Sequence, residues 1–310
     1  MTTKEAEKLV YNVWNRCKNH FFKNTPSERC HSWEQADETS LRALEEYFHG
    51  SAYRFSMLLT LAKQYLPEKA KVLDAGAGHG VLALALKDAG FNAAASDLHQ
   101  GLAIFEEENI PYYQWHLEAH AAPFPDNSFD AVILSQTIEH FTYSPLKPLQ
   151  ELVRVLRPSG ILIVDAPNIS CFHNISRLFR GKSLHWNLKK HYLEQVAEVV
   201  DGVPYYDRHN HEYSYEDLLD IADYFDLKVE NIAYYSSCNK KKRGQFAIFF
   251  SHIRDAVKRW RKGIYAVYRL PSDAKQANVG ETFSSQKVTH RLQAEKTSSA
   301  HLLHVKPAEG

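Results

Sequence analysis

The stretch AKVLDAGAGHG, residues 70–80, decides the fold. A short apolar run ends there in three glycines at alternate positions, and the helix-like VLALALKDAG follows at 81–90. This order predicts a buried strand, a tight loop and a helix. Because glycine tolerates positive φ and has no Cβ, the loop can form a floor on which a ligand lies. The amides at the start of the helix favour an anionic group on that ligand.

The alternation of strand and helix continues along the chain. Further strands are predicted at 91–98, 112–117, 129–136, 160–167, 227–237 and 263–270, and further helices at 99–109, 145–157 and 214–225. Strands that alternate with helices favour parallel pairing with right-handed crossovers. We therefore predict an α/β fold with a doubly wound, mostly parallel, seven-stranded Rossmann-like sheet.

The rest of the chain is expected to be added to this sheet. Residues 1–66 read as a helical leader that caps the main domain, which is expected to span 67–270. Residues 167–212 follow the fifth strand, where an insertion would cover a ligand crevice. Residues 271–310 are polar and lack periodicity, so a disordered tail is predicted.

Composition excludes several classes of protein. Lys plus Arg equals Asp plus Glu at 37 each, so no overall field suggests a nucleic-acid partner. The four cysteines are far apart, which argues against a zinc knuckle or a disulfide framework. The N-terminus lacks the apolar stretch of a secretory signal, and no run approaches the roughly 20 apolar residues of a membrane span. A cytoplasmic location is expected.

The spacing of the glycines distinguishes two cofactor classes. A dinucleotide fingerprint would place its third glycine at position 81, which is Val81. The pattern found is Gly76-x-Gly78-x-Gly80 with Asp74 two positions before it. This pattern resembles the first motif of class I methyltransferases that depend on S-adenosylmethionine (SAM), including the type 11 and ubiquinone-pathway enzymes. The alternative interpretation is a simple strand-to-helix turn.

The resemblance implies a set of cofactor contacts beyond the glycine loop. Asp97 stands where these enzymes place an acid that accepts both ribose hydroxyls, and Glu118 where an aspartate usually lies near the adenine amino group. Arg54 is similar to an arginine that grips the cofactor carboxylate, and Gln136 is expected to contact the cofactor as well. A turn aspartate and a salt-bridged arginine are the alternatives for Asp97 and Arg54.

Catalytic residues are harder to read, because methyl transfer requires alignment and few obligatory side chains. Glu139 and His140 follow the fourth strand, and a neutral imidazole there can take a proton from the acceptor. His140 could instead only pack the loop. Some ubiquinone O-methyltransferases bind a divalent metal through Glu-x-x-Glu-His, but Gln136 replaces the first glutamate, so no metal is predicted.

Two later segments are candidates for contacts with the acceptor. His209, His211 and Glu212 precede the helix predicted at 214–225 and could line the acceptor pocket, with surface loop histidines as the alternative. Residues 240–262 are basic and carry apolar residues at helical spacing. Such a helix could rest on an anionic membrane or meet a lipid-linked substrate, or it could pack its apolar side on the sheet.

The function predicted from these observations is transfer of a methyl group from SAM to a small-molecule acceptor, at a hydroxyl oxygen. The acceptor could be a glycan precursor, a quinone or a secondary metabolite. Two other readings stay open. One is a non-catalytic, SAM-binding regulatory protein, and the other is an RNA or protein methyltransferase.

Overall fold

The computed structural model of the protein describes residues 1–23, 38–236 and 255–273. The chain divides into two compact units, Met1–Ser272 and Asp273–Gly310, and the fold described here is that of the first. The tail predicted over 271–310 therefore lies, from position 274 onward, outside the described residues.

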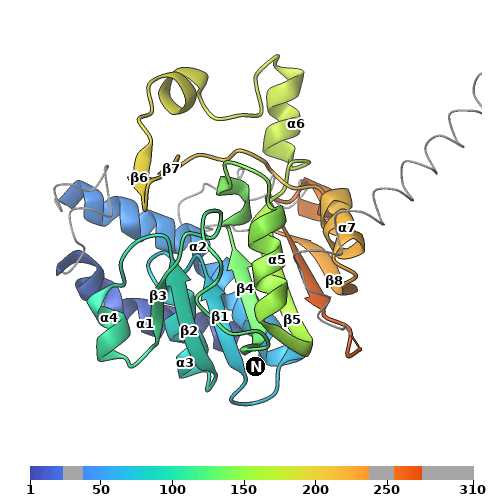
Figure 1. Ribbon diagram of the computed structural model, residues 1–310. Helices are drawn as coiled ribbons and strands as arrows, with labels where there is room; N and C mark the ends of the chain where they lie inside the picture. The colour runs from blue at the N-terminus through green and yellow to red at the C-terminus, as the bar shows by residue number, and fades with distance from the viewer. Residues whose placement is uncertain (24–37, 237–254, 274–310) are drawn as a thin grey trace, which may run out of the picture. The chain divides into compact units, whose positions relative to one another are not determined.

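One seven-stranded sheet forms the centre of the first unit (Figure 1). Its strands are β1 (Lys71–Ala75), β2 (Asn92–Asp97), β3 (Tyr112–Gln114), β4 (Phe129–Ser135), β5 (Leu156–Pro167), β8 (Lys228–Tyr235) and β9 (Gly263–Arg269). Their order is β3-β2-β1-β4-β5-β9-β8. The strands β1 to β5 pair in parallel, while β9 runs antiparallel to both neighbours. The predicted fold class is confirmed.

Helices cover the sheet and explain why its central strands are apolar along their whole length. The helices that follow strands are α3 (Val81–Asp88), α4 (Ala103–Glu107), α5 (Leu146–Val155) and α7 (Tyr215–Tyr224). Six consecutive residues of α3 are buried, because α3 lies between the sheet and the N-terminal helices. The helix α7 starts at a capping box in which Ser214 and Asp217 exchange hydrogen bonds.

The N-terminal helices α1 (Thr3–Lys23) and α2 (Glu38–Tyr65) share the core of the main fold. Trp14 of α1 stacks on Phe48 of α2 with ring centroids 4.3 Å apart. Arg16 of α1 donates a 2.9 Å hydrogen bond to Asp88 at the end of α3. The leader is helical as predicted, and its side chains also form one wall of the cavity described below.

Several predicted bounds are wrong, because pairing in the sheet overrides local sequence pattern. The helix predicted at 99–109 shortens to α4, and the strand predicted at 112–117 ends at Gln114. The strand β5 begins at Leu156, inside the helix predicted at 145–157, because Leu156 pairs with Phe129 of β4 before a register shift. Hydrogen bonding of this segment to β4 is more favourable than continuation of the helix.

The segment between β5 and α7 stands above the carboxyl ends of the strands (Figure 1). It contains α6 (Phe172–Phe179), a π-helical turn η3 (Lys189–Leu193) and a hairpin of β6 (Glu198–Val200) and β7 (Val203–Tyr205). His99, after β2, lies 3.4 Å from the carboxylate of Glu198 in this hairpin. The segment predicted as an insertion at 167–212 therefore reaches back over the ends of the strands.

The basic segment predicted as one helix over 240–262 is described only from Asp255. The predicted helix does not extend to residue 262. Val257 is extended, with φ −83° and ψ 99°, and a 3-10 turn η5 (Lys258–Trp260) precedes β9. The Trp260 ring lies 5.7 Å from that of Phe172 in α6. Within the described residues, every helix is too short or too polar to cross a membrane.

Candidate functional site

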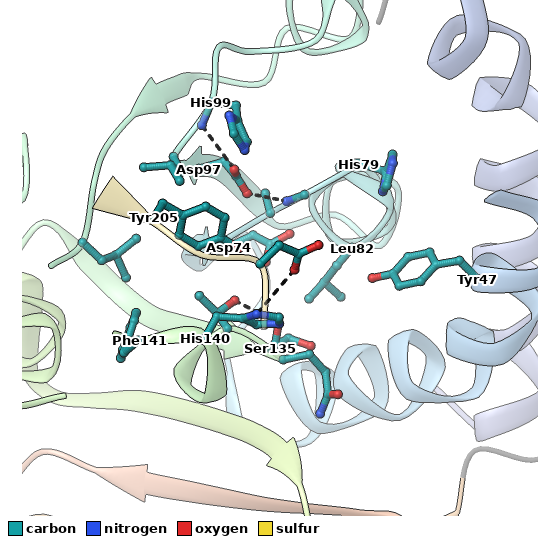
Figure 2. A pocket seen from close by; sticks show the side chains of 18 of the residues that line it. Tyr47, Asp74, His79, Leu82, Asp97, His99, Ser135, His140, Phe141 and Tyr205 are labelled. Atoms are coloured by element: carbon teal, nitrogen blue, oxygen red, sulfur yellow. Dashed lines mark hydrogen bonds and ion pairs between the residues drawn. The ribbon is translucent and has the colours of Figure 1, made fainter. Parts of the chain in front are cut away.

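A cavity of about 860 Å³ opens at the carboxyl ends of β1, β2 and β4 (Figure 2). The sheet reverses its winding between β1 and β4, and ligands of open α/β sheets bind at such switch points. Eight of the ten residues predicted for the site line this cavity: Arg54, Asp74, Gly76, Gly78, Asp97, Glu118, Gln136 and His140. Gly80 and Glu139 lie behind the lining.

The glycine loop forms the floor of the cavity, and its glycines differ in their surroundings. A side chain at Gly76 would overlap Thr137, so only glycine fits there. Gly78 has a φ of +52°, and among the described residues nothing lies within 4 Å of where its Cβ would be. Gly80 precedes α3, and a side chain there would meet the Phe105 ring. Gly78 faces the ligand space, whereas Gly80 serves packing.

Two carboxylates flank this loop. Asp97 at the end of β2 accepts a 2.7 Å hydrogen bond from the backbone amide of Gly78, which fixes the loop to the neighbouring strand. Asp74 near the end of β1 is 2% exposed. Burial, and then the nearby charge of Asp97, raises the pKa of Asp74 to about 7. A cationic group of a ligand would favour the ionised form of this carboxyl.

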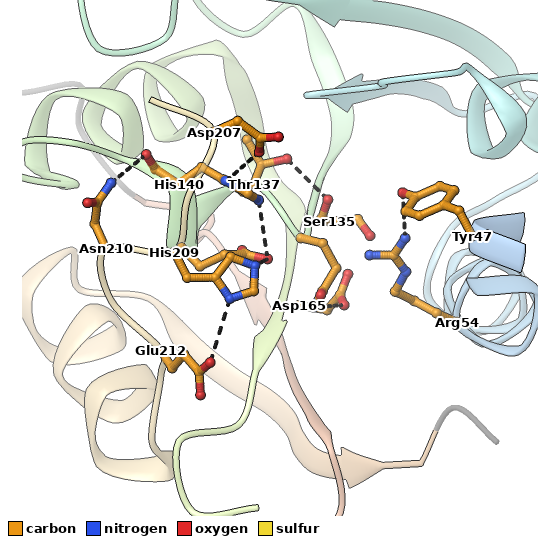
Figure 3. Close-up of polar contacts among 12 residues, drawn as sticks. Tyr47, Arg54, Ser135, Thr137, His140, Asp165, Asp207, His209, Asn210 and Glu212 are labelled. Carbon is orange, nitrogen blue, oxygen red and sulfur yellow. Dashed lines mark hydrogen bonds and ion pairs between the residues drawn. The ribbon is translucent and has the colours of Figure 1, made fainter. Parts of the chain in front are cut away.

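Arg54 and Asp165 belong to a cluster of buried polar side chains (Figure 3). The sequence predicted Arg54 and Gln136 as members of the site but not Asp165 or Tyr235. Asp165 of β5 is fully buried and accepts hydrogen bonds from the Tyr235 hydroxyl at 2.6 Å and from the Gln136 amide at 3.1 Å. Gln136 has a φ of +49°. Arg54 of α2 is 6% exposed and donates to the Tyr47 hydroxyl at 3.2 Å. Its Nε has no hydrogen-bond partner among the described residues.

Glu118 lies in the loop after β3 on another wall of the cavity. Its Oε1 accepts a 2.8 Å hydrogen bond from the backbone amide of Tyr143. This bond holds the carboxylate in place and leaves further lone pairs for an amino group of a ligand.

His140 and His209 lie close together (Figure 3), and Glu139 lies near both of them. Glu139 and His140 belong to the 3-10 turn η2 (Ile138–His140), and His209 precedes α7. The Nε2 atoms of His140 and His209 each lie 4.0 Å from Oε1 of Glu139. The two rings are perpendicular, with centroids 5.0 Å apart. Glu139 is fully buried, neither of its oxygens accepts a hydrogen bond from a described residue, and burial raises its pKa to about 8.

Each imidazole has a second carboxylate behind it. Oδ1 of Asp207 lies 3.7 Å from Nδ1 of His140, and Oε1 of Glu212 lies 3.6 Å from Nδ1 of His209. Burial, and then His209, lowers the pKa of His140 to about 4. His140 is therefore uncharged at neutral pH and has a lone pair available on one ring nitrogen.

Backbone hydrogen bonds hold the loop of His209 against the turn of His140. The Asn210 amide donates to the Glu139 carbonyl at 2.7 Å, and the Asn210 side chain donates to the His140 carbonyl at 3.1 Å. His209 is 20% exposed, whereas His211 is 56% exposed. The sequence predicted a pocket role or a surface loop for both, and the structure separates them, since only His209 points inward.

Comparison with known proteins finds a family match for part of the chain. Residues 73–164, which run from β1 into β5, match the family profile of the methyltransferase domain. The chain is 34% identical over 116 residues to a demethylmenaquinone methyltransferase of Renibacterium salmoninarum, covering 37% of this chain and 48% of that protein. It is 30% identical over 135 residues to a ubiquinone/menaquinone biosynthesis C-methyltransferase of Cronobacter sakazakii, covering 41% and 49%.

The chain thus spans about half the length of these curated relatives. Among solved structures, a SAM-dependent methyltransferase from Archaeoglobus fulgidus aligns with a TM-score of 0.47 and 15% identity over 72% of this chain and 99% of that one. The family match over residues 73–164, together with the glycine loop and the sheet order, identifies this part of the chain as a methyltransferase domain of the class I, SAM-dependent family.

Proposed function

We propose that this chain transfers a methyl group from SAM to a small-molecule acceptor, and that the acceptor atom is a hydroxyl oxygen. One observation carries the proposal. The glycine loop and the uncharged His140 line the same cavity, so a methyl donor on the loop and a proton acceptor can meet one substrate. Some relatives are named as C-methyltransferases, so carbon is the alternative acceptor atom that product analysis would reveal.

The cofactor is proposed to lie along the ends of β1 and β2. Asp74 is buried near the loop and suits the ammonium group, while the Arg54 guanidinium suits the carboxylate at the other end of the amino-acid part. The two oxygens of Asp97 suit the ribose hydroxyls. The Glu118 carboxylate suits the adenine amino group, and Gln136, which donates to Asp165, suits a contact beside the loop. The glycine backbone leaves room for the sulfonium.

Methyl transfer is an in-line displacement in which the acceptor oxygen forms a bond to the methyl carbon as the bond from sulfur breaks. SAM would supply the methyl group together with the leaving sulfur, and His140 would take the proton that the hydroxyl loses. The resulting imidazolium would lie between Asp207, 3.7 Å from Nδ1, and Glu139, 4.0 Å from Nε2. The Asp207 carboxylate would stabilise that charge, and the imidazolium would in turn favour ionisation of Glu139, whose pKa burial raises to about 8.

Calorimetric titration of the purified protein with SAM and, separately, with NADH tests the cofactor assignment. We expect heat of binding with SAM and none with NADH. The reverse result would replace the methyltransferase proposal with a dehydrogenase-like function. A screen with SAM labelled in its methyl group, read by mass spectrometry, then identifies the acceptor and the atom that is methylated. Methylated oxygen supports the proposal, and methylated carbon or nitrogen overturns the hydroxyl assignment.

A further inference from the structure

Glu139 is an unusual residue in this site, because it is a fully buried carboxylic acid that accepts no hydrogen bond from the described residues. Burial of a polar group without a partner costs about 1–3 kcal/mol, so such groups call for an explanation. The groups that face it are two imidazole nitrogens, each 4.0 Å from Oε1. One atom placed between these three groups would satisfy all of them.

We propose that Glu139, His140 and His209 hold a divalent transition-metal ion at the acceptor end of the cavity. The donor atoms of the three side chains all lie within 4.8 Å of one another. An ion with bonds of about 2.0–2.2 Å holds its ligands roughly 3–3.5 Å apart. Small side-chain rotations inward from the observed distances are sufficient to form such a site.

The ligand chemistry indicates which class of ion would bind. Two imidazoles and one carboxylate suit zinc, manganese, iron or cobalt, whereas magnesium and calcium prefer sites made only of oxygen. His209, about 70 positions further along the chain, supplies the third ligand. The site therefore needs no charged residue at position 136, where Gln136 stands. It therefore differs from the Glu-x-x-Glu-His pattern that the sequence lacks.

The outer carboxylates support the same assignment. Asp207 lies 3.7 Å from Nδ1 of His140, and Glu212 lies 3.6 Å from Nδ1 of His209. Histidine ligands of metals commonly donate their second N–H to a carboxylate, which fixes the tautomer and strengthens the ligand. Neither Nδ1 makes a hydrogen bond to a described residue at these separations. If each imidazole closed on its carboxylate, both protons would lie on Nδ1 and both Nε2 lone pairs would face Glu139.

The consequence for the reaction rests on the proposed function. Of the three ligands, His140 lines the cavity, so an open coordination position on this side would meet the acceptor hydroxyl. A bound ion lowers the pKa of such a hydroxyl, which then loses its proton to water and attacks the methyl group as an oxyanion. Nε2 of His140 cannot bind the ion and also take a proton, so the loaded chain would not use His140 as its base.

Titration of the full chain with Co²⁺ or Zn²⁺ after treatment with EDTA tests the site. We expect one tightly bound ion per chain and, for Co²⁺, visible absorption bands of a site with nitrogen ligands. His209→Ala and the nearly isosteric Glu139→Gln should each weaken binding at least about 100-fold, because each removes a direct ligand. His211→Ala is the matched control, since His211 is a neighbouring histidine that points outward, and it should bind like wild type.

The absence of a tight metal site in the wild-type chain would overturn the proposal. So would folded His209→Ala and Glu139→Gln variants that bind the ion as tightly as wild type does. Circular dichroism of both variants verifies that they are folded. SAM binding, measured in the same samples, separates this proposal from the proposed function. A chain that binds the ion but not SAM refutes the methyltransferase function alone, whereas one that binds SAM but no ion refutes the metal site alone.

Discussion

The two ends of the cavity are built in different ways. The cofactor end uses the loop after β1 and the end of β2, and its main residues, from Asp74 to Asp97, lie within 24 consecutive positions. The acceptor end combines η2 with the loop before α7, so that His140 and His209 meet from positions 69 residues apart. A short motif can specify the first end, whereas the second depends on how a long insertion returns to the sheet.

The two ends also differ in what holds a ligand. At the cofactor end, backbone amides and strand ends form the surface, and Asp97 is fixed by the Gly78 amide. At the acceptor end, the His140 side chain lines the cavity with Glu139 and His209 behind it. Hydrogen bonds of Asn210 hold the loop of His209 against the turn of His140. Changes at the first end should therefore act on cofactor affinity, and changes at the second on turnover.

The largest effect is expected at the floor of the cofactor end. Gly78→Arg should lower SAM affinity more than about 1,000-fold, because the new side chain projects into the ligand space of the cavity. Isothermal titration calorimetry measures this loss. Gly90→Arg is a matched control, since Gly90 also has positive φ and open space around it but lies outside the cavity lining. Retained affinity in folded Gly78→Arg would show that the cofactor lies elsewhere.

At the acceptor end, His140→Ala should reduce turnover by about 100-fold or more, because it removes the proposed base of the ion-free chain and a proposed ligand of the ion in the loaded chain. SAM affinity should remain nearly unchanged. Steady-state kinetics with the identified acceptor measure the first quantity, and calorimetry the second. A fully active variant would remove His140 from the reaction and leave it a packing role.

Asp97→Ala should weaken SAM binding by about 1–3 kcal/mol through the loss of charged hydrogen bonds. The glycine loop also loses the carboxylate that accepts from the Gly78 amide. Competition binding of SAM and S-adenosylhomocysteine should show similar losses for both, since both carry the ribose. A loss confined to SAM would argue that Asp97 acts on the sulfonium charge instead.

SAM affinity should rise by about 15-fold between pH 5.5 and 7, because the ionised fraction of a group with a pKa near 7 increases by that factor. The free chain holds the pKa of Asp74 near 7, well above its usual value, so Asp74 is protonated at the acid end of this range. A bound ammonium favours the carboxylate, so binding releases a proton and strengthens as pH rises. Calorimetry at several pH values measures the slope. In Asp74→Asn, which cannot ionise, the slope should flatten, and an unchanged slope would assign it to another group.

The smallest effect is expected in the loop that joins the two segments of the acceptor end. Asn210→Ala removes the hydrogen bond to the His140 carbonyl and should cost about 1 kcal/mol of unfolding free energy. SAM affinity should change less than twofold, because the cofactor end is built independently. Denaturant unfolding and calorimetry give the two values. A large loss of SAM affinity would mean that the two ends are coupled.

The sequence predicted much of the cofactor end. Asp74, Gly76 and Gly78 were predicted from the glycine-loop pattern and Asp97 from the family resemblance, and all four line the cavity. It predicted Gly80 as a cofactor residue too, but Gly80 packs against Phe105 behind the lining. Spacing shows that a glycine is present, but it does not show whether a ligand or a neighbouring side chain fills the space beside it.

Other residues of the site gave no local signal. Asp165 of β5 and Tyr235 of β8 lie 70 positions apart and meet only because β9 pairs with both strands and lies between them. His209 and His211 look alike in sequence, and the hydrogen bonds of Asn210 decide which of them faces Glu139. Sequence periodicity could not distinguish them, because both belong to an irregular loop.

The sequence by itself determined the order of the main strands and helices and the glycine loop, because these follow from short-range patterns of polarity and backbone freedom. The cofactor class followed from the resemblance of that loop to the SAM-dependent family. The tertiary structure alone decided where β5 begins, which histidine points inward and that Glu139 lies buried between two imidazoles. These features depend on contacts between segments far apart in the chain, and such contacts are set by the packing of the whole sheet and its insertion.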